Sequence, residues 1–402
     1  MTHLVVFSHL RWNFVYQRPQ HLLSRLALHH PVVYVEEPLH SDGPARLDAS
    51  RPAPGVQVLR PHTPVAAPGF HDDQLASLEA LLAGHLPGLV GDDYAVWFYT
   101  PMALPILGDL QPRAVIYDCM DELSAFKDAP RQMRQRETAL LKLADVVLTG
   151  GPSLYEAKRS LHPNALCLPS AVDADHYALA PSRVDAALAE RAAALKDPTG
   201  RPRLGFFGVI DERLDIDLLG RLADAEPGWQ FDMVGPVVKI DPAMLPNRPN
   251  IRWLGQQPYE LLPYLIADWD VCLMPFAMNE STRFISPTKT LEYLAAGKAV
   301  VSTPVPDVVG MFGDIVAIAA DTAGFLQACR AALARTPAQC AEFSAAAAAC
   351  ARRHSWDNAA AQARAAIDSV LQAQPRGTRT ARTGDGAAAA TAEAPLKVAS
   401  AA

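Results

Sequence analysis

The chain has 402 residues, of which 50% are hydrophobic and 20% charged, a composition typical of a globular protein with two domains. Its net charge of -7 argues against a general nucleic-acid binder, and no apolar run approaches the roughly 20 residues of a membrane span. The six cysteines are scattered without a Cys-x-x-Cys pair, which indicates buried thiols rather than a disulfide framework or a zinc site. We expect a cytoplasmic protein and leave attachment at a membrane surface open.

The first half of the chain alternates short apolar runs with amphipathic stretches such as RPQHLLSRLALHH and MRQRETALLKLA. Strands that are buried on both faces and joined by helices indicate a parallel, doubly wound sheet. The candidate strands are Leu4–Ser8, Val32–Glu36, Ala95–Tyr99, Ala114–Asp118, Val146–Thr149 and Leu166–Pro169.

The second half of the chain restarts the same pattern. Two such series predict an α/β protein with two facing Rossmann-like domains, whose ligand binds in the cleft at the carboxyl ends of the strands. The second set of candidate strands is Leu204–Val209, Gln230–Val234, Ile251–Leu254, Val271–Pro275, Ala299–Thr303 and Ile315–Ile318.

The domain boundaries follow from these two series. We expect a first domain over 1–175, a linker over 176–202 and a second domain over 203–352. A closing helix over 353–374 begins near Ser355, a plausible N-cap, and carries Trp356 and Ile367 on one face. The remaining 375–402 has small residues and no aromatics, which predicts a disordered tail.

The most informative segment is VCLMPFAMNESTRFISPTKTLEYLAAGKAVVSTP, which runs from Val271 to Pro304. It predicts a strand, a polar loop, a helix and a further strand. Ser286 is a good N-cap, Pro287 a good first helical residue, and Gly297 suits a left-handed cap at the helix end.

Two cations stand at the start of this helix, where the helix dipole disfavours them. Arg283 and Lys289 are explained if an anion such as a diphosphate binds there, because a helix N-terminus offers free amides and partial positive charge. Glu292 lies one turn beyond Lys289 and could accept hydrogen bonds from sugar hydroxyls. The alternative is a capped helix with a surface Lys289–Glu292 pair, and we favour the anion site.

The second domain opens with GFFGVIDERLD. Gly205 and Gly208 flank a strand end and allow a phosphate close to the backbone, with Arg213 following. An ordinary tight turn capped by Asp211 is an equal alternative. The segment is not GxGxxG, which disfavours an NAD-dependent enzyme.

Polar residues also follow two strands of the first domain, in HLRWNFVYQRPQHLL and YDCMDE. We expect Arg18 and His21 of the first segment, and Asp118 and Asp121 of the second, to face an acceptor. The alternatives are a surface loop that packs Trp12 into the core and a group of helix-capping acids. No pattern marks a dedicated metal cage, so we predict no metal site.

The chain resembles bacterial GT-B glycosyltransferases of the retaining, glycogen-synthase-like group, most closely those of teichuronic-acid or exopolysaccharide type. The likeness covers nearly the whole chain except the tail, and SPTKTLEYLAAGKAVV is its most specific part. The other segments that carry it are WNFVYQRPQHLLSRL, IYDCMDELSAF, LTGGPSLYEAKR, LGFFGVIDERLD, MVGPVVKI, NIRWLGQQPYELLPYL and HSWDNAA.

The resemblance implies a nucleotide-sugar donor on the second domain, an acceptor on the first, and a closing helix that returns to the first domain. It assigns Glu292 to the donor ribose. The residues that it places at the diphosphate are Ser286, Pro287, Thr288 and Lys289, with Arg213 and Arg283 as phosphate partners. Gly208 joins the donor-binding residues on the interpretation of the glycine turn.

Two positions depart from the family pattern. The earlier of two glutamates separated by seven residues is Phe284 here, and Glu280 is the nearest substitute. The arginine that often follows the first glycine turn is Val209 here, and Arg213 is a candidate replacement.

The function implied is transfer of a sugar from a nucleoside-diphosphate sugar to a glycan or lipid-linked acceptor in cell-surface or exopolysaccharide synthesis. Cations would neutralise the leaving diphosphate, so neither a metal nor another cofactor is expected. The alternatives are a sugar-nucleotide epimerase on the same fold and a catalytically silent binding protein. A basic strip of Arg131, Arg134 and Arg136 would suit an anionic membrane or be a solvated helix face.

Overall fold

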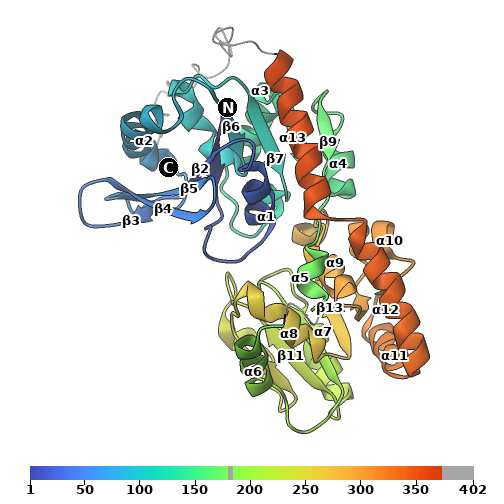
Figure 1. The fold of residues 1–402 in the computed structure, drawn as a ribbon. Helices are drawn as coiled ribbons and strands as arrows, with labels where there is room; N and C mark the ends of the chain where they lie inside the picture. The colour runs from blue at the N-terminus through green and yellow to red at the C-terminus, as the bar shows by residue number, and fades with distance from the viewer. Residues whose placement is uncertain (180–183, 374–402) are drawn as a thin grey trace, which may run out of the picture.

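The structure is a computed structural model that describes residues 1–179 and 184–373, and Figure 1 shows its two lobes. The expected tail over 375–402 and part of the expected linker, 180–183, lie outside the described residues. The α/β class with two parallel sheets is confirmed. Each of the twelve candidate strands has a counterpart in the structure.

The first sheet has the order β3-β5-β2-β1-β6-β7-β8-β9, with β4 antiparallel on the edge of β5 and every other pair parallel. Apolar clusters cover both faces: in β1, Leu4 and Val6 point to one cluster and Val5 and Phe7 to the other. The strands are β1 His3–Ser8, β2 Val32–Glu36, β3 Leu39–His40, β4 Arg46–Ala53, β5 Val56–Thr63, β6 Tyr94–Phe98, β7 Val115–Cys119, β8 Val146–Thr149 and β9 Ala165–Cys167.

Helices cover the two faces of this sheet. One face lies under α1 and the closing helix α13, and the other under α2, α3 and the 3₁₀ segment η2. The elements are α1 Arg18–Leu26, η1 Asp72–Gln74, α2 Leu75–Val90, η2 Pro101–Asp109, η3 Leu123–Ala125, α3 Met133–Leu143 and α4 Pro152–Lys158.

The second sheet has the order β12-β11-β10-β13-β14-β15 and is parallel throughout. Its strands are β10 Arg203–Phe207, β11 Gln230–Val234, β12 Ile251–Trp253, β13 Val271–Met274, β14 Ala299–Ser302 and β15 Ala317–Ile318. Its helical elements are α5 Ala174–Tyr177, α6 Ala186–Ala194, α7 Ile216–Ala225, η5 Pro242–Met244, η6 Tyr259–Leu261, α8 Leu262–Ala267, η7 Glu280–Thr282, α9 Thr288–Ala295, α10 Pro306–Phe312, α11 Thr322–Leu333 and α12 Pro337–Arg352.

The chain crosses between the lobes twice at one place. The Val172 amide donates to His354 O (2.8 Å), and the Trp356 amide donates to Val172 O (3.3 Å). Helix α13 (Trp356–Ala373) then runs along the first lobe, as Figure 1 shows, and buries Trp356 and Ile367 in the cluster that holds Leu4. The first lobe therefore takes its core from both ends of the described chain.

Several expectations of local structure are corrected. Helix α9 begins at Thr288 with Pro287 as its N-cap, one residue later than expected, while Gly297 has the expected left-handed backbone with φ +70°. All six cysteines are free, but Cys340 is exposed and Cys167 is only half-buried, whereas buried thiols were expected. Within the described ranges, no helix is both long and apolar enough to cross a membrane, and no group of three or more His, Cys, Asp or Glu is placed to hold a metal.

Candidate functional site

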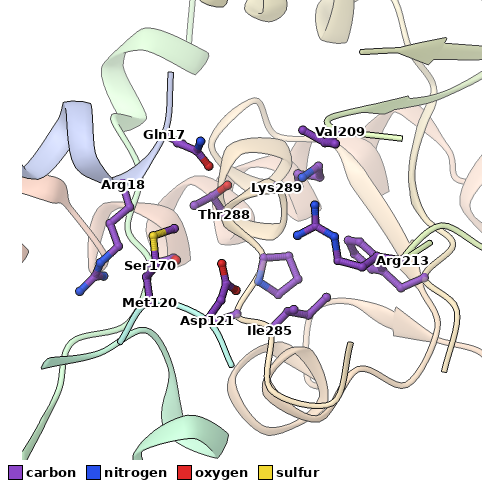
Figure 2. Close-up of a pocket in the computed structure, with 13 residues that line it drawn as sticks. Gln17, Arg18, Met120, Asp121, Ser170, Val209, Arg213, Ile285, Thr288 and Lys289 are labelled. Atoms are coloured by element: carbon purple, nitrogen blue, oxygen red, sulfur yellow. The ribbon is translucent and has the colours of Figure 1, made fainter. Parts of the chain in front are cut away.

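Two adjoining cavities lie between the sheets, with volumes of about 110 and 640 Å³. The smaller one is shown in Figure 2. Both domains contribute to both cavities, as expected for ligands at the carboxyl ends of parallel strands. The residues that line both cavities are Gln17, Val209, Arg213, Thr288 and Lys289.

The start of helix α9 forms one wall of the smaller cavity. Ser286, Pro287, Thr288 and Lys289 all line it, so the structure places this predicted group together. Burial lowers the pKa of Lys289, whose ammonium lies 5.7 Å from the centre of the Phe206 ring. A helix N-terminus with an added cation is suited to an anion.

Gly208 makes room for Lys289. It has φ +141°, and a Cβ built on it would lie 2.0 Å from Lys289 Cε. Gly235 approaches equally closely, because its Cβ would lie 1.8 Å from Gly208 O. These contacts require glycine for the close approach of two strand ends and the lysine. Gly208 lines the larger cavity, next to the lysine that spans both.

Glu292 lies in the wall of the larger cavity, on the same helix as Lys289. Burial raises the pKa of its carboxyl to about 7, against the opposing effects of Lys289 and of the Tyr177 and Thr288 hydroxyls. The surface Lys289–Glu292 pair that was the alternative interpretation is therefore not what the structure shows, because Glu292 is buried and acts on Lys289 only through its charge.

Arg213 lies where the two cavities meet. Its Nε donates to Asp211 Oδ1 (2.9 Å) and its Nη2 to Asp211 Oδ2 (2.7 Å), a bidentate pair that fixes the guanidinium. The Asp211 carboxylate therefore chiefly orients the Arg213 guanidinium. It also accepts one hydrogen bond from the Arg213 amide (3.0 Å), which is the turn-capping role considered as the alternative.

Asp121 is the predicted acceptor-side carboxyl that reaches the smaller cavity. Burial raises its pKa to about 6, while Arg213, Arg18 and Lys289 favour its charged form. Figure 2 shows it entering from the first domain, and Arg213 and Lys289 from the second. A carboxyl thus stands across the cavity from two cations.

The charged groups of Arg18 and Asp118 are bound to each other, whereas we expected them to face an acceptor. They form a buried pair in which Arg18 Nη2 lies 2.9 Å from Asp118 Oδ1, with side chains 2% and 0% exposed. Arg18 Nη1 also donates to Leu168 O (2.8 Å). Asp118 lines neither cavity, and Arg18 forms part of the wall of the smaller one. A carboxylate buried at a strand end needs such a partner, so the pair positions the wall.

His21 is also displaced from its expected role, because it lines neither cavity. Its ring stacks on Trp356 at 4.9 Å, and burial lowers its pKa to about 3. His21 belongs to a group of ring contacts where the two lobes meet. The group comprises Tyr16, His21, His176, Tyr259 and Trp356.

Glu280 and Arg283 are corrections to the sequence-based site. Their side chains are 76% and 62% exposed, face each other at 3.8 Å and line neither cavity. The reason is the turn that precedes them: Asn279 and Thr282 form a capping box that buries Thr282 and turns the charged residues outward. Phe284, at the missing glutamate position, packs on the core of the first domain.

Sequence reasoning missed the residues of the first domain that reach the second. Tyr16 stacks on Tyr259 at 4.6 Å, and Gln256 Nε2 donates to Phe14 O (2.5 Å). Phe126 lies under Arg213. The available signal was aromatic residues in loops after strands, but such residues also pack locally, and their partners are far away in the sequence.

Comparisons with known proteins agree with this geometry. Residues 201–335 match the model of the family Glycosyl transferases group 1. The putative teichuronic acid biosynthesis glycosyltransferase TuaH of Bacillus subtilis (strain 168) is 33% identical over 106 residues, 26% of this chain and 27% of that protein. The chain therefore matches about a quarter of the length of this curated relative.

Similar solved structures cover the whole fold. Sucrose-phosphate synthase from Thermosynechococcus elongatus has a TM-score of 0.70 at 16% identity, covering 93% of this chain and all of that one. Anabaena HepE in complex with UDP and glucose has a TM-score of 0.66 at 14% identity, covering 92% of this chain and all of that one. At these identities the likeness shows the fold. The chain therefore has the two-domain GT-B fold, and residues 201–335 are the part that is similar to the Glycosyl transferases group 1 family.

Proposed function

We propose that the protein transfers a sugar from a nucleoside-diphosphate sugar to a hydroxyl acceptor. The observation that carries this proposal is the convergence of Lys289, Arg213 and the start of helix α9 at the junction of two cavities, one of which contains Glu292. The family match of the second domain and the name of the similar TuaH protein support it.

The larger cavity takes the nucleoside, and the smaller one takes the far phosphate and the sugar. Glu292 accepts hydrogen bonds from the ribose hydroxyls, while Lys289, Arg213 and the amides of α9 hold the diphosphate. The bond from the sugar to the diphosphate breaks as the bond to the acceptor oxygen forms. Fixed cations stabilise the negative charge that develops on the leaving group, and in our proposal they do so without a metal.

The acceptor binds from the first domain. Asp121 is placed to accept a hydrogen bond from the attacking hydroxyl, whose proton is lost in the reaction. We propose that the sugar keeps its anomeric configuration, as the resemblance to retaining enzymes implies. The charges of Arg213 and Lys289 favour the charged form of Asp121.

We propose a glycan or lipid-linked acceptor from cell-surface or exopolysaccharide synthesis, handled in the cytoplasm at the membrane face. The relative's name, which refers to teichuronic acid biosynthesis, supports this class. Arg131 and Arg134 are exposed and available to anionic lipid, whereas Arg136 donates to Met102 O (2.8 Å) within the domain. Flotation with vesicles that contain phosphatidylglycerol tests the membrane contact, and loss of binding in the Arg131→Ala, Arg134→Ala double variant is expected.

Calorimetric titration with UDP, GDP, ADP and dTDP, with and without Mg²⁺, tests the donor site. We expect one base to bind with a micromolar dissociation constant, and to bind equally well without Mg²⁺. Arg213→Ala and Glu292→Ala should each weaken binding by roughly tenfold or more, as loss of a charged hydrogen bond does. Arg283→Ala is the matched control and should leave affinity unchanged, because that arginine lines neither cavity.

Failure of all four nucleotides to bind would overturn the proposed donor site. Once the base is known, incubation with its common nucleotide sugars separates the reaction types. Transfer to an added glycan, with release of the nucleoside diphosphate, is the expected outcome. Conversion of the donor to another sugar nucleotide without an acceptor would instead indicate an epimerase.

A further inference from the structure

The first domain places an aromatic ring against the arginine of the donor site. The Phe126 ring centre lies 5.4 Å from Arg213 Cζ and 5.3 Å from Lys239 Nζ, and both cations come from the second domain. At these distances the ring attracts each cation through its π face. Phe126 lies in the loop that follows β7, the same loop that carries Asp121 into the cavity.

The neighbours of Phe126 bind the second domain as well. Ala125 O accepts a hydrogen bond from Ser281 Oγ (3.0 Å), and the Lys127 amide donates to Glu212 Oε1 (3.3 Å). Glu212 directly precedes Arg213 in the chain. Three consecutive residues, 125–127, therefore each contact the second domain, and two of their four contacts are made to the segment 212–213.

A buried ion network anchors this loop in the first domain. Lys158 Nζ lies 2.6 Å from Glu122 Oε2 and 2.8 Å from Glu137 Oε1, and the lysine is buried. Ser124 Oγ donates to Glu122 Oε1 (2.7 Å). Because a buried, satisfied network holds one arrangement, the loop is a firm base for residues 125–127.

The guanidinium of Arg213 has one edge left for a ligand. Asp211 takes its Nε and Nη2, and no residue in the described part of the chain takes a hydrogen bond from its Nη1. We propose that Phe126 is a positioning residue: closure of the domains seats its ring on Arg213 and aims the Nη1 edge at the donor's diphosphate. This inference rests on the proposed function and adds a link between closure and phosphate recognition.

The chain offers a matched control for this role. Phe284 also packs on the core of the first domain and has its own cation, Arg283, whose Cζ lies 5.1 Å from the ring centre. Neither of these residues lines a cavity. Phe284→Leu therefore removes an aromatic ring and a cation–π pair from the domain interface and leaves Arg213 in place.

The experiment compares UDP with UMP, or the corresponding pair for whichever base binds the full-length protein. The parent protein should bind UDP more tightly than UMP, because only UDP has a second phosphate that can contact Arg213 and Lys289. Phe126→Leu should reduce the ratio of UDP to UMP affinity roughly three- to tenfold, in line with a partly desolvated cation–π contact. Phe126→Tyr should retain the parent's ratio, and Phe284→Leu should leave it unchanged.

Each outcome bears on the proposal. An unchanged ratio in Phe126→Leu overturns it, as does an equal loss of UDP and UMP affinity in both leucine variants, which would indicate a general packing role. A parent that binds no nucleotide overturns the proposed function, and this inference with it. If Phe126→Leu does not fold, Glu212→Ala removes the Lys127 contact instead and should lower the ratio in the same direction.

Discussion

The contact between Gly208 and Lys289 is the sharpest steric constraint on the site. We expect Gly208→Ala to displace the lysine and to weaken nucleoside-diphosphate binding by roughly tenfold, because its Cβ would lie 2.0 Å from Lys289 Cε. Titration calorimetry measures this. Gly84→Ala is the control, since nothing lies within 4 Å of its Cβ in helix α2, and it should leave affinity unchanged while stabilising the protein by up to about 1 kcal/mol. Equal affinity in Gly208→Ala and the parent would contradict the assignment of Lys289.

The sequence alone could predict those residues of the site that lie close together on one helix. Lys289 and Glu292 are held on one face by helical spacing, so both could be placed before the structure was known. Arg283 was misplaced because its direction depends on the capping box of the preceding turn. The pairing of Arg18 with Asp118 was missed for another reason: the two residues are 100 positions apart, and neither local pattern shows the partner.

At the scale of elements, the loop between β1 and α1 closes one side of the larger cavity. Tyr16→Ala should speed nucleotide dissociation roughly two- to tenfold, the usual worth of an aromatic pair, because it removes the stack on Tyr259. Stopped-flow displacement with a fluorescent nucleotide measures the rate. Phe14→Ala is a close control: Phe14 is 39% exposed like Tyr16, lines the same cavity, and contacts Gln256 through its backbone oxygen. A rate that rises equally in both variants would argue against the stack.

Most of the fold could be predicted because its strands are buried on both faces. A continuous apolar run such as that of β13 is a strong signal, and all twelve such runs became strands. The strands at one end of the first sheet, β3 and β4, and their neighbour β5 were missed. Strand β4 (Arg46–Ala53) is mostly exposed and carries charges and a proline, so its pairing with β5 leaves no hydrophobic pattern in the sequence.

For the whole molecule, one partly buried acid, Glu37, predicts how stability depends on pH. Burial raises the pKa of Glu37 from 4.5 to about 7. Between these values the folded protein holds a proton that the unfolded chain has lost, so the free energy of unfolding contributed by this group falls as pH rises through that window. Relative to the parent, Glu37→Gln should therefore be equally stable near pH 4.5 and more stable at pH 8, by on the order of 1–2 kcal/mol.

Urea denaturation at both pH values checks this expectation. Glu342→Gln, on an exposed position of helix α12, removes one charge without changing a buried site and should show no pH-dependent gain. A Glu37→Gln variant that tracks the parent at every pH would mean that this carboxyl titrates as it does in the unfolded chain.

The closing helix has a consequence for how the protein is made. The cluster that contains Leu4 and Val6 is completed by Ile367 and Leu371, so its packing must wait until nearly all of the described chain has been synthesised. The second domain, by contrast, draws its sheet from β10 to β15 and can assemble earlier, although it is translated later than most of the first. We expect a released fragment that ends at residue 355 to carry a protease-resistant second domain and an N-terminal half that is still cleaved.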